Sequence, residues 1–383
     1  MITETTKLNV LMVTPRYFPY MGGIETHVHE VGRRLVDRGV KVTLLTTMPR
    51  TPRTPAKPLP KEEVIEGMHV IRVSAWPPQR DYYIAPEISS IIGQGSWDLV
   101  HCQGCHTFVP PMAMIAAKRA RLPYVVTFHT GGHSSGFRSS IRGTQWKLTR
   151  PLFAGAAKLI GVSRFEADYF QHTLKLPEQL FTVISNGVTL PTRTQRSSNS
   201  EVQVQPLIIS IGRLERYKGH QRLITALPKI REQRPDMKLL ILGGGPYEAE
   251  LRALARRVGV ADHVEIRLIP AGDRAAMTET LSRAALVALL SEYEAHPIGV
   301  MEALSLARPV LVADTSGLSE LAEQGLVRAI ALQSTPEEVA TAALQQIENP
   351  IVPSQVSLPT WEHCADELQA VYEACARREL CVS

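Results

Sequence analysis

The chain has 383 residues, of which 44% are hydrophobic and 21% are charged, and its formal net charge is +5. This is the composition of a globular protein, and the length is enough for two domains of roughly 150–200 residues. The sequence has no run of about 18 apolar residues, which excludes a transmembrane helix, and its polar, acidic start is unlike a signal peptide. Five scattered cysteines also exclude a disulfide framework. We therefore expect a cytoplasmic protein.

Charge is distributed unevenly along the chain. Residues 1–190 contain 22 lysines and arginines against 13 aspartates and glutamates, whereas the remainder contains 20 against 24. A basic half indicates a domain that meets an anionic partner, such as a phospholipid surface, a lipid-linked phosphate or nucleic acid. Aromatic residues are only 6%, and no zinc-finger or RNA-binding signature accompanies the basic residues. We therefore expect no nucleic-acid partner.

The first half alternates predicted strands and helices. An apolar run at 8–13, a helical pattern at 23–39 that ends on a glycine, and a second apolar run at 40–47 predict a βαβ unit. The proline-rich segment 49–63 is a poor candidate for regular structure and predicts a surface loop. Further apolar runs predict strands, with helical stretches between several of them: 69–75, 97–102, 123–129, 158–163 and 181–188.

A polar stretch without apolar periodicity, residues 191–205, predicts a linker between two domains. A second series of strands and helices follows it, with strands at 206–214, 238–245, 263–270, 284–292 and 309–314, and helices at 220–230, 248–260 and after Pro297. Such alternation predicts a doubly wound parallel sheet in each half. The predicted fold class is therefore α/β, with two Rossmann-like domains, residues 1–190 and 206–367, that face a central cleft at the carboxyl ends of their strands.

Two glutamates stand eight residues apart in the stretch "YEAHPIGVMEAL". In one continuous helix Glu294 and Glu302 would lie roughly 12 Å apart along the axis. Pro297 argues against that helix, because it fixes its own φ, lacks an N–H and steers the preceding residue away from helical geometry. We expect a loop that carries Glu294, followed by a helix that begins near Ile298. Both carboxylates could then reach one ligand across the helix N-terminus, where open N–H groups favour an anion. Two solvated surface glutamates are the alternative.

A basic loop is predicted at "GRLERYKGH", residues 212–220, between an apolar strand and a helix. Arg213 offers a bidentate fork and Lys218 a point charge, and Gly212 and Gly219 let the backbone approach a phosphate closely. A solvated loop that happens to be basic is the alternative.

A pair of glycines, Gly22 and Gly23 in "PYMGGIE", stands after the first strand and before a helix. The pair permits close contact between backbone and phosphate, although plain loop glycines are nearly as common. The sequence has no dinucleotide-binding G-x-G-x-x-G and no P-loop, and "GGGP" at 243–246 lacks the dinucleotide spacing. A dehydrogenase or an ATPase is therefore disfavoured.

Taken together, these stretches resemble the retaining nucleotide-sugar glycosyltransferases of family 4, which have the GT-B fold. The resemblance runs from "PYMGGIETHVHEVGRRLVDRG" through "NGV", "GRLERYKG" and "EAHPIGVMEALSLARPVLVAD" to "WEHCADELQAVYEA". It implies that residues 1–190 bind the acceptor, that residues 206–367 bind the nucleotide sugar, and that a C-terminal helix at 368–383 crosses back to the first domain.

The resemblance also implies roles for individual residues. The catalytic set is His129, which reaches the transferred sugar, Glu294, which contacts it, and Arg213 and Lys218, which neutralise the donor diphosphate. Glu302 binds the ribose hydroxyls. The remaining donor-binding residues are Gly22, Gly23, Ile298 and Gly299, and the acceptor candidates are Tyr17, His101, His106 and His133.

The chain departs from the family pattern at several positions. Ala295, His296 and Pro297 stand where the family usually has Gly-Phe-Gly, so Pro297 removes an amide donor to the sugar and leaves the identity of the donor open. Ala307 replaces a glycine before the "PV" strand, and Thr189 replaces an aspartate after "NGV". None of these changes removes a charged catalytic group.

Two histidine-containing stretches could be mistaken for metal or haem sites. "CQGCH", Cys102 to His106, matches the c-type haem attachment pattern, but haem attachment normally needs export and we expect no signal peptide. The stretch also lacks the second Cys pair of a structural zinc site. In "HTGGHSSG", the two glycines between His129 and His133 argue against metal-ligand spacing on a helix. We expect no metal site.

The predicted function is transfer of a sugar from a nucleotide diphosphate, with a UDP-sugar favoured and GDP-mannose as the alternative, to a small-molecule, glycan or lipid-linked hydroxyl with retained configuration. Cationic side chains and a helix N-terminus would stabilise the leaving diphosphate without a metal or other cofactor. No nucleophile–base pair is evident, which suits a front-face mechanism in which the leaving phosphate takes the acceptor proton. A nucleotide-sugar epimerase and a non-catalytic nucleotide-sugar-binding subunit are the alternatives.

A basic segment of the first half, "GFRSSIRGTQWKLTR", predicts a surface for anionic lipid. It sets Arg138, Arg142, Lys147 and Arg150 around Trp146. A peripheral position at the inner face of the membrane would follow, and a solvated helix is the alternative.

Overall fold

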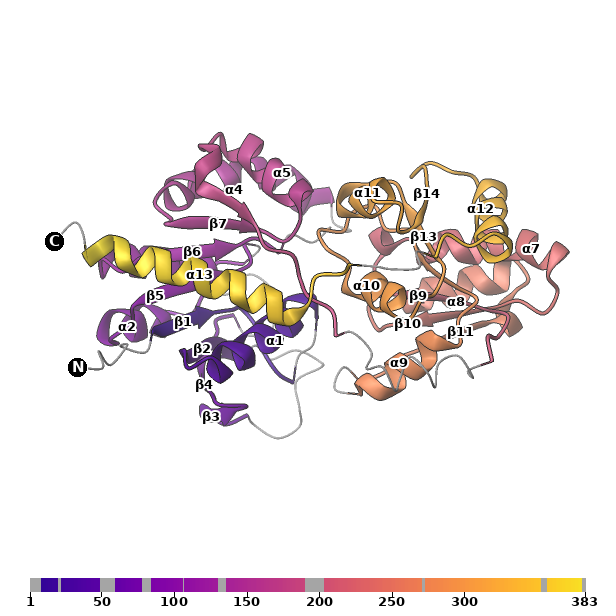
Figure 1. The fold of residues 1–383 in the computed structure, drawn as a ribbon. Helices are drawn as coiled ribbons and strands as arrows, with labels where there is room; N and C mark the ends of the chain where they lie inside the picture. The colour runs from indigo at the N-terminus through magenta and orange to yellow at the C-terminus, as the bar shows by residue number, and fades with distance from the viewer. Residues whose placement is uncertain are drawn as a thin grey trace. The chain divides into compact units, whose positions relative to one another are not determined.

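The computed structural model describes residues 8–19, 22–48, 59–77, 84–105, 107–129, 136–189, 203–270, 273–352 and 357–380, with the backbone alone for 136–142 and 378–380. The chain forms two compact units, each a sheet with helices packed against it (Figure 1). The first unit contains residues up to Thr130, residues 141–187 and the C-terminal segment from Pro359. Residues 188–358 make up most of the second unit.

The described residues of the first unit form eight strands, β1 (Asn9–Val13), β2 (Lys41–Met48), β3 (Glu62–Ile65), β4 (Met68–Ser74), β5 (Leu99–Gln103), β6 (Tyr124–Thr127), β7 (Lys158–Gly161) and β8 (Phe181–Val183). They form one sheet in the order β3-β4-β2-β1-β5-β6-β7-β8, and only the pairing of β3 with β4 is antiparallel. The strand order reverses between β1 and β5. Doubly wound sheets bind their ligands at the carboxyl ends of strands at such a point.

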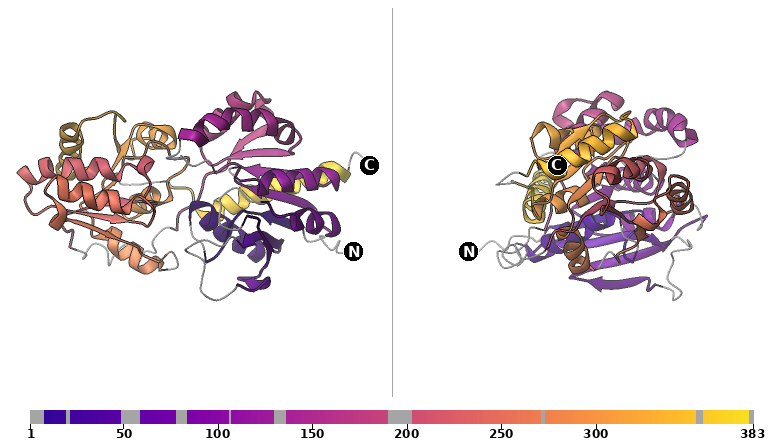
Figure 2. Two further views of the ribbon diagram at one scale, coloured as in Figure 1. Left: turned by 180° about the vertical axis from the view of Figure 1, so that it is seen from behind. Right: turned by 90° about the vertical axis from the view of Figure 1, so that its right-hand side faces the viewer.

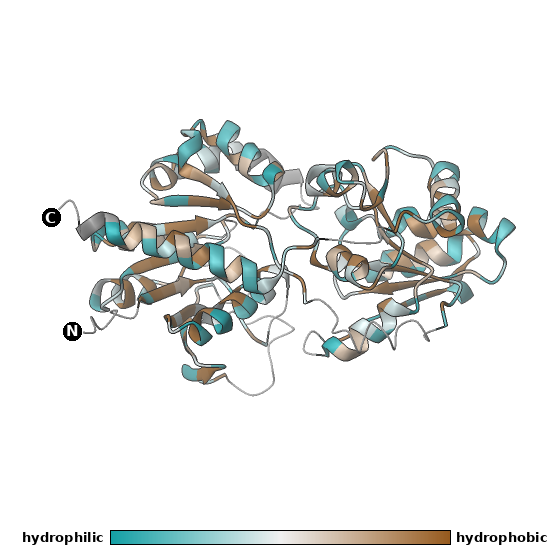
Figure 3. Ribbon diagram, viewed as in Figure 1, coloured by the Kyte–Doolittle hydropathy of each residue, from teal (hydrophilic) through white to brown (hydrophobic). Residues whose placement is uncertain are grey.

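The helices of the first unit are α1 (Gly23–Asp37), α2 (Glu87–Gln94), α3 (Val109–Arg119), α4 (Gly136–Ala154), α5 (Arg164–Leu174) and α13 (Trp361–Leu380). In α1, Val28, Val31 and Leu35 recur at helical spacing and are fully buried against the sheet. The helix is followed by Gly39, whose φ of 86° suits glycine. The central strands are buried on both faces. Figure 3 shows that they are apolar in both units.

The last helix of the chain, α13, belongs to the first unit. It packs against α1 and β5, and Figures 1 and 2 show it lying along the first sheet beside α1. Trp361, Cys364, Leu368 and Tyr372 form its buried stripe, at intervals of three and four residues. The segment that returns to the first unit begins at Pro359, earlier than the predicted position 368.

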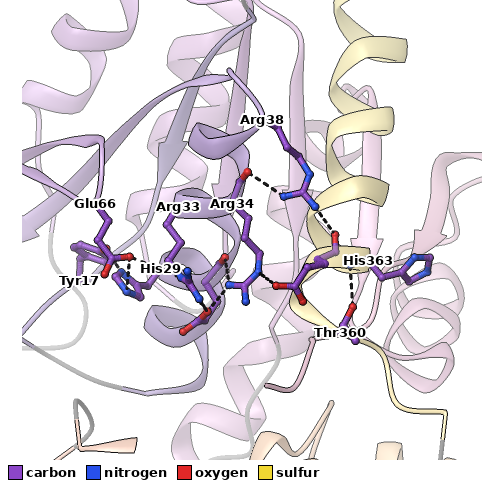
Figure 4. Close-up of polar contacts among 10 residues, drawn as sticks. Tyr17, His29, Arg33, Arg34, Arg38, Glu66, Thr360 and His363 are labelled. Carbon is purple, nitrogen blue, oxygen red and sulfur yellow. Dashed lines mark hydrogen bonds and ion pairs between the residues drawn. The ribbon is translucent and has the colours of Figure 1, made fainter. Parts of the chain in front are cut away.

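Ion pairs fix the position of α13 along α1. Arg34 Nε donates to Glu362 over 2.7 Å (Figure 4). Arg38 Nε donates to Asp366 over 2.8 Å. Glu30 on α1 accepts a further bond from Arg34 over 2.5 Å. Because Glu362 and Asp366 are exposed, each of these pairs contributes little free energy of folding, and the apolar stripe holds the helix.

In the second unit, the part of the chain that the structure describes forms six parallel strands, β9 (Leu207–Ile211), β10 (Lys238–Leu242), β11 (Val264–Arg267), β12 (Leu286–Leu289), β13 (Val310–Ala313) and β14 (Arg328–Ile330). Their order is β11-β10-β9-β12-β13-β14, so the strand order reverses between β9 and β12. The helices are α7 (His220–Gln233), α8 (Glu248–Arg257), α9 (Arg274–Ser282), α10 (Ile298–Ser305), α11 (Ser316–Glu323) and α12 (Pro336–Glu348).

The order of strands and helices predicted from the sequence is confirmed in both halves, and α10 begins at Ile298 as expected. The prediction of a loop for 49–63 is wrong at its end, because Glu62 and Glu63 open the edge strand β3. The residues of β3 alternate between exposed and half-buried, which suits an edge strand. Residues 59–61 have no regular structure, as predicted, whereas residues 49–58 and the linker up to residue 202 lie outside the described residues.

Candidate active site

In the second unit, two loops meet at the point where the strand order reverses. The loop after β9 carries "GRLERYKG", and the loop after the adjacent strand β12 carries Glu294. A main-chain bond joins the loops, from Glu292 N–H to the Tyr217 carbonyl over 2.7 Å. The basic loop and the loop that carries Glu294 therefore lie together because they follow two neighbouring parallel strands.

Lys218 and Glu294 form an ion pair at this junction. Lys218 Nζ lies 2.6 Å from Glu294 Oε1, and both side chains are largely buried, with 14% and 12% exposed. Burial lowers the pKa of Lys218, but Glu294 and Tyr217 raise it by more, so it lies above its usual value. The lysine is therefore charged at neutral pH, and its ammonium points at the carboxylate.

Serines on both sides hold Glu294 in place. Ser291 Oγ donates to Glu294 Oε1 over 2.8 Å, and the Glu294 N–H donates to Ser316 Oγ over 2.8 Å. The Glu294 carbonyl accepts from the N–H of Gly317 over 2.9 Å. A Cβ on Gly317 would lie 2.0 Å from the Ala295 carbonyl oxygen, so only glycine lets α11 approach this loop.

A second glycine fixes the basic loop. Gly219 has φ of 75°, and a Cβ there would lie 1.9 Å from the Leu290 carbonyl oxygen. His220 follows it, buried and bonded through Nδ1 to Ser210 Oγ over 2.8 Å and through Nε2 to the Arg213 carbonyl over 3.2 Å. Burial lowers the pKa of His220 to about 4, so the imidazole that anchors the loop is neutral.

Arg213 is the most accessible of the predicted charged residues of the site, with 52% of its side chain exposed. Its Nη1 lies 2.6 Å from Glu215, and its Nη2 donates to the Tyr217 hydroxyl over 2.9 Å. These contacts keep the guanidinium beside the loop that carries Lys218.

Glu302 lies in α10, one turn after Ile298 and Gly299, where the first backbone N–H groups have no intrahelical acceptor. Its side chain is 12% exposed and pairs with Arg274 at the start of α9. Burial raises the pKa of Glu302, and Arg274 partly offsets this. Sequence reasoning missed Arg274, because a partner 28 residues away on another helix leaves no local pattern.

In the first unit, His129 follows β6 and has φ of 47°, a left-handed conformation that is unusual for histidine. Its Nε2 lies 2.7 Å from Gln103 Oε1 on the adjacent strand β5. The ring of His27 from α1 packs edge-on against the ring of His129, with the two ring centroids 4.5 Å apart. His27 is fully buried and donates from Nδ1 to Asn186 Oδ1 over 2.8 Å. Sequence reasoning did not find Gln103 or His27.

The acceptor candidates Tyr17 and His101 are buried, and this revises their predicted role. The Tyr17 hydroxyl is bonded to His29 Nδ1 over 2.8 Å, and Figure 4 shows the two side chains together. His101 is fully buried, with Tyr372 at one ring nitrogen and Thr127 at the other. Neither side chain presents a polar atom to an acceptor. The other two candidates, His106 and His133, lie outside the described residues.

The predicted glycines of the first unit start α1. Gly22 is its N-cap and Gly23 its first residue. A Cβ on Gly22 would lie 2.6 Å from the Glu25 carboxylate, whereas a Cβ on Gly23 would meet no atom within 4 Å. The fold therefore does not itself require glycine at position 23.

The remaining motifs have structural places. Cys102 and Cys105 are buried in the core, where Cys105 lies 3.6 Å from the Phe128 carbonyl. Among the described residues, no three His, Cys, Asp or Glu side chains converge as metal ligands. Trp146 is 4% exposed and packs against Phe153 and Phe170, so the prediction that it centres a lipid-binding surface is wrong.

On the same helix, α4, Lys147, Leu148 and Arg150 are exposed. The side chains of Arg138 and Arg142 lie outside the described residues. Across the described ranges, no helix combines the length and apolar character needed to span a bilayer.

Two protein-family models match the chain, Glycosyltransferase Family 4 over residues 21–190 and Glycosyl transferases group 1 over residues 191–358. Among curated proteins, the D-inositol 3-phosphate glycosyltransferase of Jonesia denitrificans is 27% identical and aligns with 92% of this chain and 91% of its own length. The GDP-mannose:cellobiosyl-diphosphopolyprenol alpha-mannosyltransferase of Komagataeibacter xylinus is 24% identical over 88% and 82%.

Solved structures share the fold. Sucrose-phosphate synthase from Thermosynechococcus elongatus superposes with a TM-score of 0.71 at 18% identity, over 98% of each chain. Anabaena Alr3699/HepE in complex with UDP-glucose gives 0.70 at 18% identity, over 97% and 99%. The two Rossmann-like units, with charged loops at the strand reversal of the second unit, have the fold of the GT-B glycosyltransferases. The chain belongs to glycosyltransferase family 4.

Proposed function

We propose that this enzyme transfers a sugar from a nucleotide diphosphate to a hydroxyl acceptor with retention of configuration and without a metal. The observation that carries the proposal is the Lys218–Glu294 pair, placed beside Arg213 at the strand reversal of the second unit. A cation and a carboxylate side by side suit a ligand that joins an anionic diphosphate to a hydroxyl-rich sugar. We favour a UDP-sugar as donor, with GDP-mannose as the alternative.

In this proposal each charged group has one task. Lys218 and Arg213 take up the negative charge that develops on the leaving diphosphate, together with the N-terminus of α10. Glu294 accepts hydroxyl groups of the sugar, and Glu302 accepts those of the ribose. His129, from the first unit, contacts the sugar that is transferred.

The bond changes balance without a protein nucleophile. The bond between the anomeric carbon and the phosphate oxygen breaks, and the acceptor oxygen forms a bond to the same face of that carbon. The acceptor proton passes to the released phosphate oxygen. The protein orients the reactants and stabilises charge, which are the two contributions that this chemistry needs.

The decisive experiment uses the purified full-length chain with UDP-glucose and, separately, GDP-mannose. The names of the relatives supply the first acceptors to try, D-inositol 3-phosphate and cellobiosyl-diphosphopolyprenol. We expect release of nucleotide diphosphate that depends on the acceptor and survives a strong chelator. Loss of activity in chelator that Mg²⁺ or Mn²⁺ restores would refute the metal-independent mechanism.

The same assay separates the rival functions. An epimerase would convert the donor sugar without any acceptor, and a non-catalytic binding subunit would bind the donor and release nothing. The anomeric configuration of the product, read by nuclear magnetic resonance, tests retention.

We also propose that the exposed part of α4 meets an anionic lipid surface or a lipid-linked acceptor. Lys147 and Arg150 offer positive charge, and Leu148, 76% exposed, offers an apolar contact. Co-sedimentation with liposomes of phosphatidylcholine alone and with added phosphatidylglycerol tests this. We expect binding only to the anionic vesicles and its loss in Lys147→Glu/Leu148→Ser. Equal binding to both kinds of vesicle would refute the proposal.

A further inference from the structure

A continuous set of buried polar side chains joins α13 to His129. It consists of Tyr372 on α13, His101 and Gln103 on β5, and His129 after β6, all within the first unit. Tyr372, His101 and Gln103 are fully buried, and His129 is 8% exposed. Burying a polar group without a hydrogen-bond partner costs free energy. The hydrogen bonds of this set therefore define the orientation of its side chains.

Successive contacts connect Tyr372 on α13 to His129. The Tyr372 hydroxyl lies 2.5 Å from His101 Nδ1, and His101 Nε2 lies 2.8 Å from Thr127 Oγ1. The Gln103 amide nitrogen lies 3.2 Å and 3.3 Å from the two ring nitrogens of His101, so the amide packs on that ring. The other end of the amide, Oε1, lies 2.7 Å from His129 Nε2.

Donor and acceptor roles follow from the groups themselves. Burial lowers the pKa of His101 to about 3 and raises that of Tyr372 well above its usual value, so the imidazole is neutral and the phenol keeps its proton. The neutral His101 ring has one N–H, so it donates one of its two bonds, to the Tyr372 hydroxyl or to Thr127 Oγ1, and accepts the other. The amide oxygen of Gln103 only accepts, so His129 donates from Nε2–H.

We propose that Gln103 and Tyr372 are positioning residues for His129. Gln103 fixes the tautomer and ring orientation of His129, and α13, through Tyr372 and His101, fixes the amide of Gln103. The proposal rests on the proposed function only where it assigns His129 to the transferred sugar. It gives the returning helix a part in catalysis, in addition to its packing.

A matched control lies on β6. The hydroxyl of Tyr124 is also buried, and it donates to the Leu152 carbonyl over 2.6 Å. Tyr124 begins β6, whereas His129 follows the other end of that strand. Tyr124→Phe therefore removes one buried hydroxyl bond from the same unit without touching the set that includes His129.

The first test needs no ligand. Nitrogen shifts of the histidine rings in the free, full-length protein, assigned by the signal missing from His129→Gln, report the tautomer of His129. We expect protonation at Nε2 in the wild type and in Tyr124→Phe. Gln103→Met and Tyr372→Phe should give a mixture of tautomers, and Gln103→Glu, which restores an acceptor oxygen, should return the Nε2–H form. An unchanged His129 signal in Gln103→Met overturns the proposal.

The second test uses the donor, UDP-glucose or GDP-mannose, that the wild type consumes. Loss of one buried hydrogen bond should lower kcat roughly 3- to 10-fold in Gln103→Met and Tyr372→Phe. Inhibition by UDP or GDP should not change, because these products carry no sugar. The double variant should lose less than the product of the single losses, whereas Gln103→Met with Tyr124→Phe should be additive.

Wild-type kcat in both single variants would overturn the catalytic part of the proposal. A wild type that consumes neither donor would refute the proposed function, while the ring shifts would still decide whether Gln103 holds His129. The two failures are therefore distinguishable.

Discussion

At the scale of single residues, ion pairs hold the charged side chains of the candidate site in place. Lys218 pairs with Glu294, and both of these side chains are largely buried, whereas Glu302 is largely buried and its partner Arg274 is exposed. A donor that entered this site would exchange contacts with groups that are already charged and oriented, so little reorganisation would be needed during the reaction.

The two glutamates should differ in kinetic effect. A charged hydrogen bond is worth about 1.5 to 3 kcal/mol, so its loss should cost on the order of 10- to 100-fold. Glu302→Gln should mainly raise the donor KM and weaken product inhibition by nucleotide diphosphate. Glu294→Gln should mainly lower kcat, because the proposed mechanism places Glu294 beside the carbon on which charge develops. Steady-state kinetics and inhibition by UDP or GDP measure both, and equal loss of nucleotide affinity in the two variants would show that their roles are not separate.

Gly23 tests whether a glycine serves the ligand or the fold. Alanine there meets no atom within 4 Å and replaces glycine in a helix, so the protein should be as stable or up to about 1 kcal/mol more stable. If the backbone at Gly23 approaches the donor phosphates, transfer should fall at least tenfold. Gly93→Ala in α2 is the control, since it is also unobstructed and should leave transfer unchanged. Thermal unfolding and transfer rates give the answer, and full activity in Gly23→Ala would remove this residue from the site.

The sequence predicted those parts of the site that depend on local chemistry. Pro297 breaks the helix and so separates Glu294 from Glu302, and Gly219 marks the turn that presents Lys218. It did not predict Arg274, Gln103 or Ser316, because each acts through a residue on another element. It misplaced Trp146, because an amphipathic helix with basic residues does not reveal which side faces the core.

At the scale of elements, the turn between α10 and β13 carries strain. Ala307 has φ of 53°, the left-handed conformation that glycine adopts at low cost. This explains physically why the family usually has glycine at that position.

Ala307→Gly should therefore stabilise the second unit by about 1 kcal/mol, because the side chain that opposes the left-handed conformation is removed. Ala253→Gly, at an exposed position within α8, should instead destabilise it by about 1 kcal/mol. Urea unfolding of the two variants measures the difference, and destabilisation by both would show that Ala307 is not strained.

At the scale of the whole molecule, buried neutral histidines couple folding to pH. Burial lowers the pKa values of His27, His101 and His220 to about 4, about 3 and about 4. The unfolded chain binds protons to these groups more tightly, so their contribution to stability is complete above pH 6.5 and is lost as pH falls toward the folded values. Two of the three lie in the first unit.

Between pH 7.5 and pH 5, we expect each of these histidines to lower the free energy of unfolding by roughly 2 kcal/mol. Because two of them lie in the first unit, that unit should unfold before the second. Urea unfolding at the two pH values, followed by hydrogen exchange, measures the loss and assigns it to a unit. His27→Gln should lessen the dependence on pH, and His172→Gln, which replaces an exposed ring on α5, should not. Equal stability at both pH values would contradict the prediction.

The path of α13 has a consequence for biosynthesis. Residues 1–187 leave the ribosome first, but the stripe of Trp361, Cys364, Leu368 and Tyr372 that covers their sheet is made last. Until then the nascent first unit exposes apolar surface and lacks the Tyr372 contact to His101 Nδ1, while residues 188–358 can already be complete. The half of the enzyme that is synthesised first is therefore the half that matures last, and a chain that stops before Pro359 would leave that half open to chaperones and proteases.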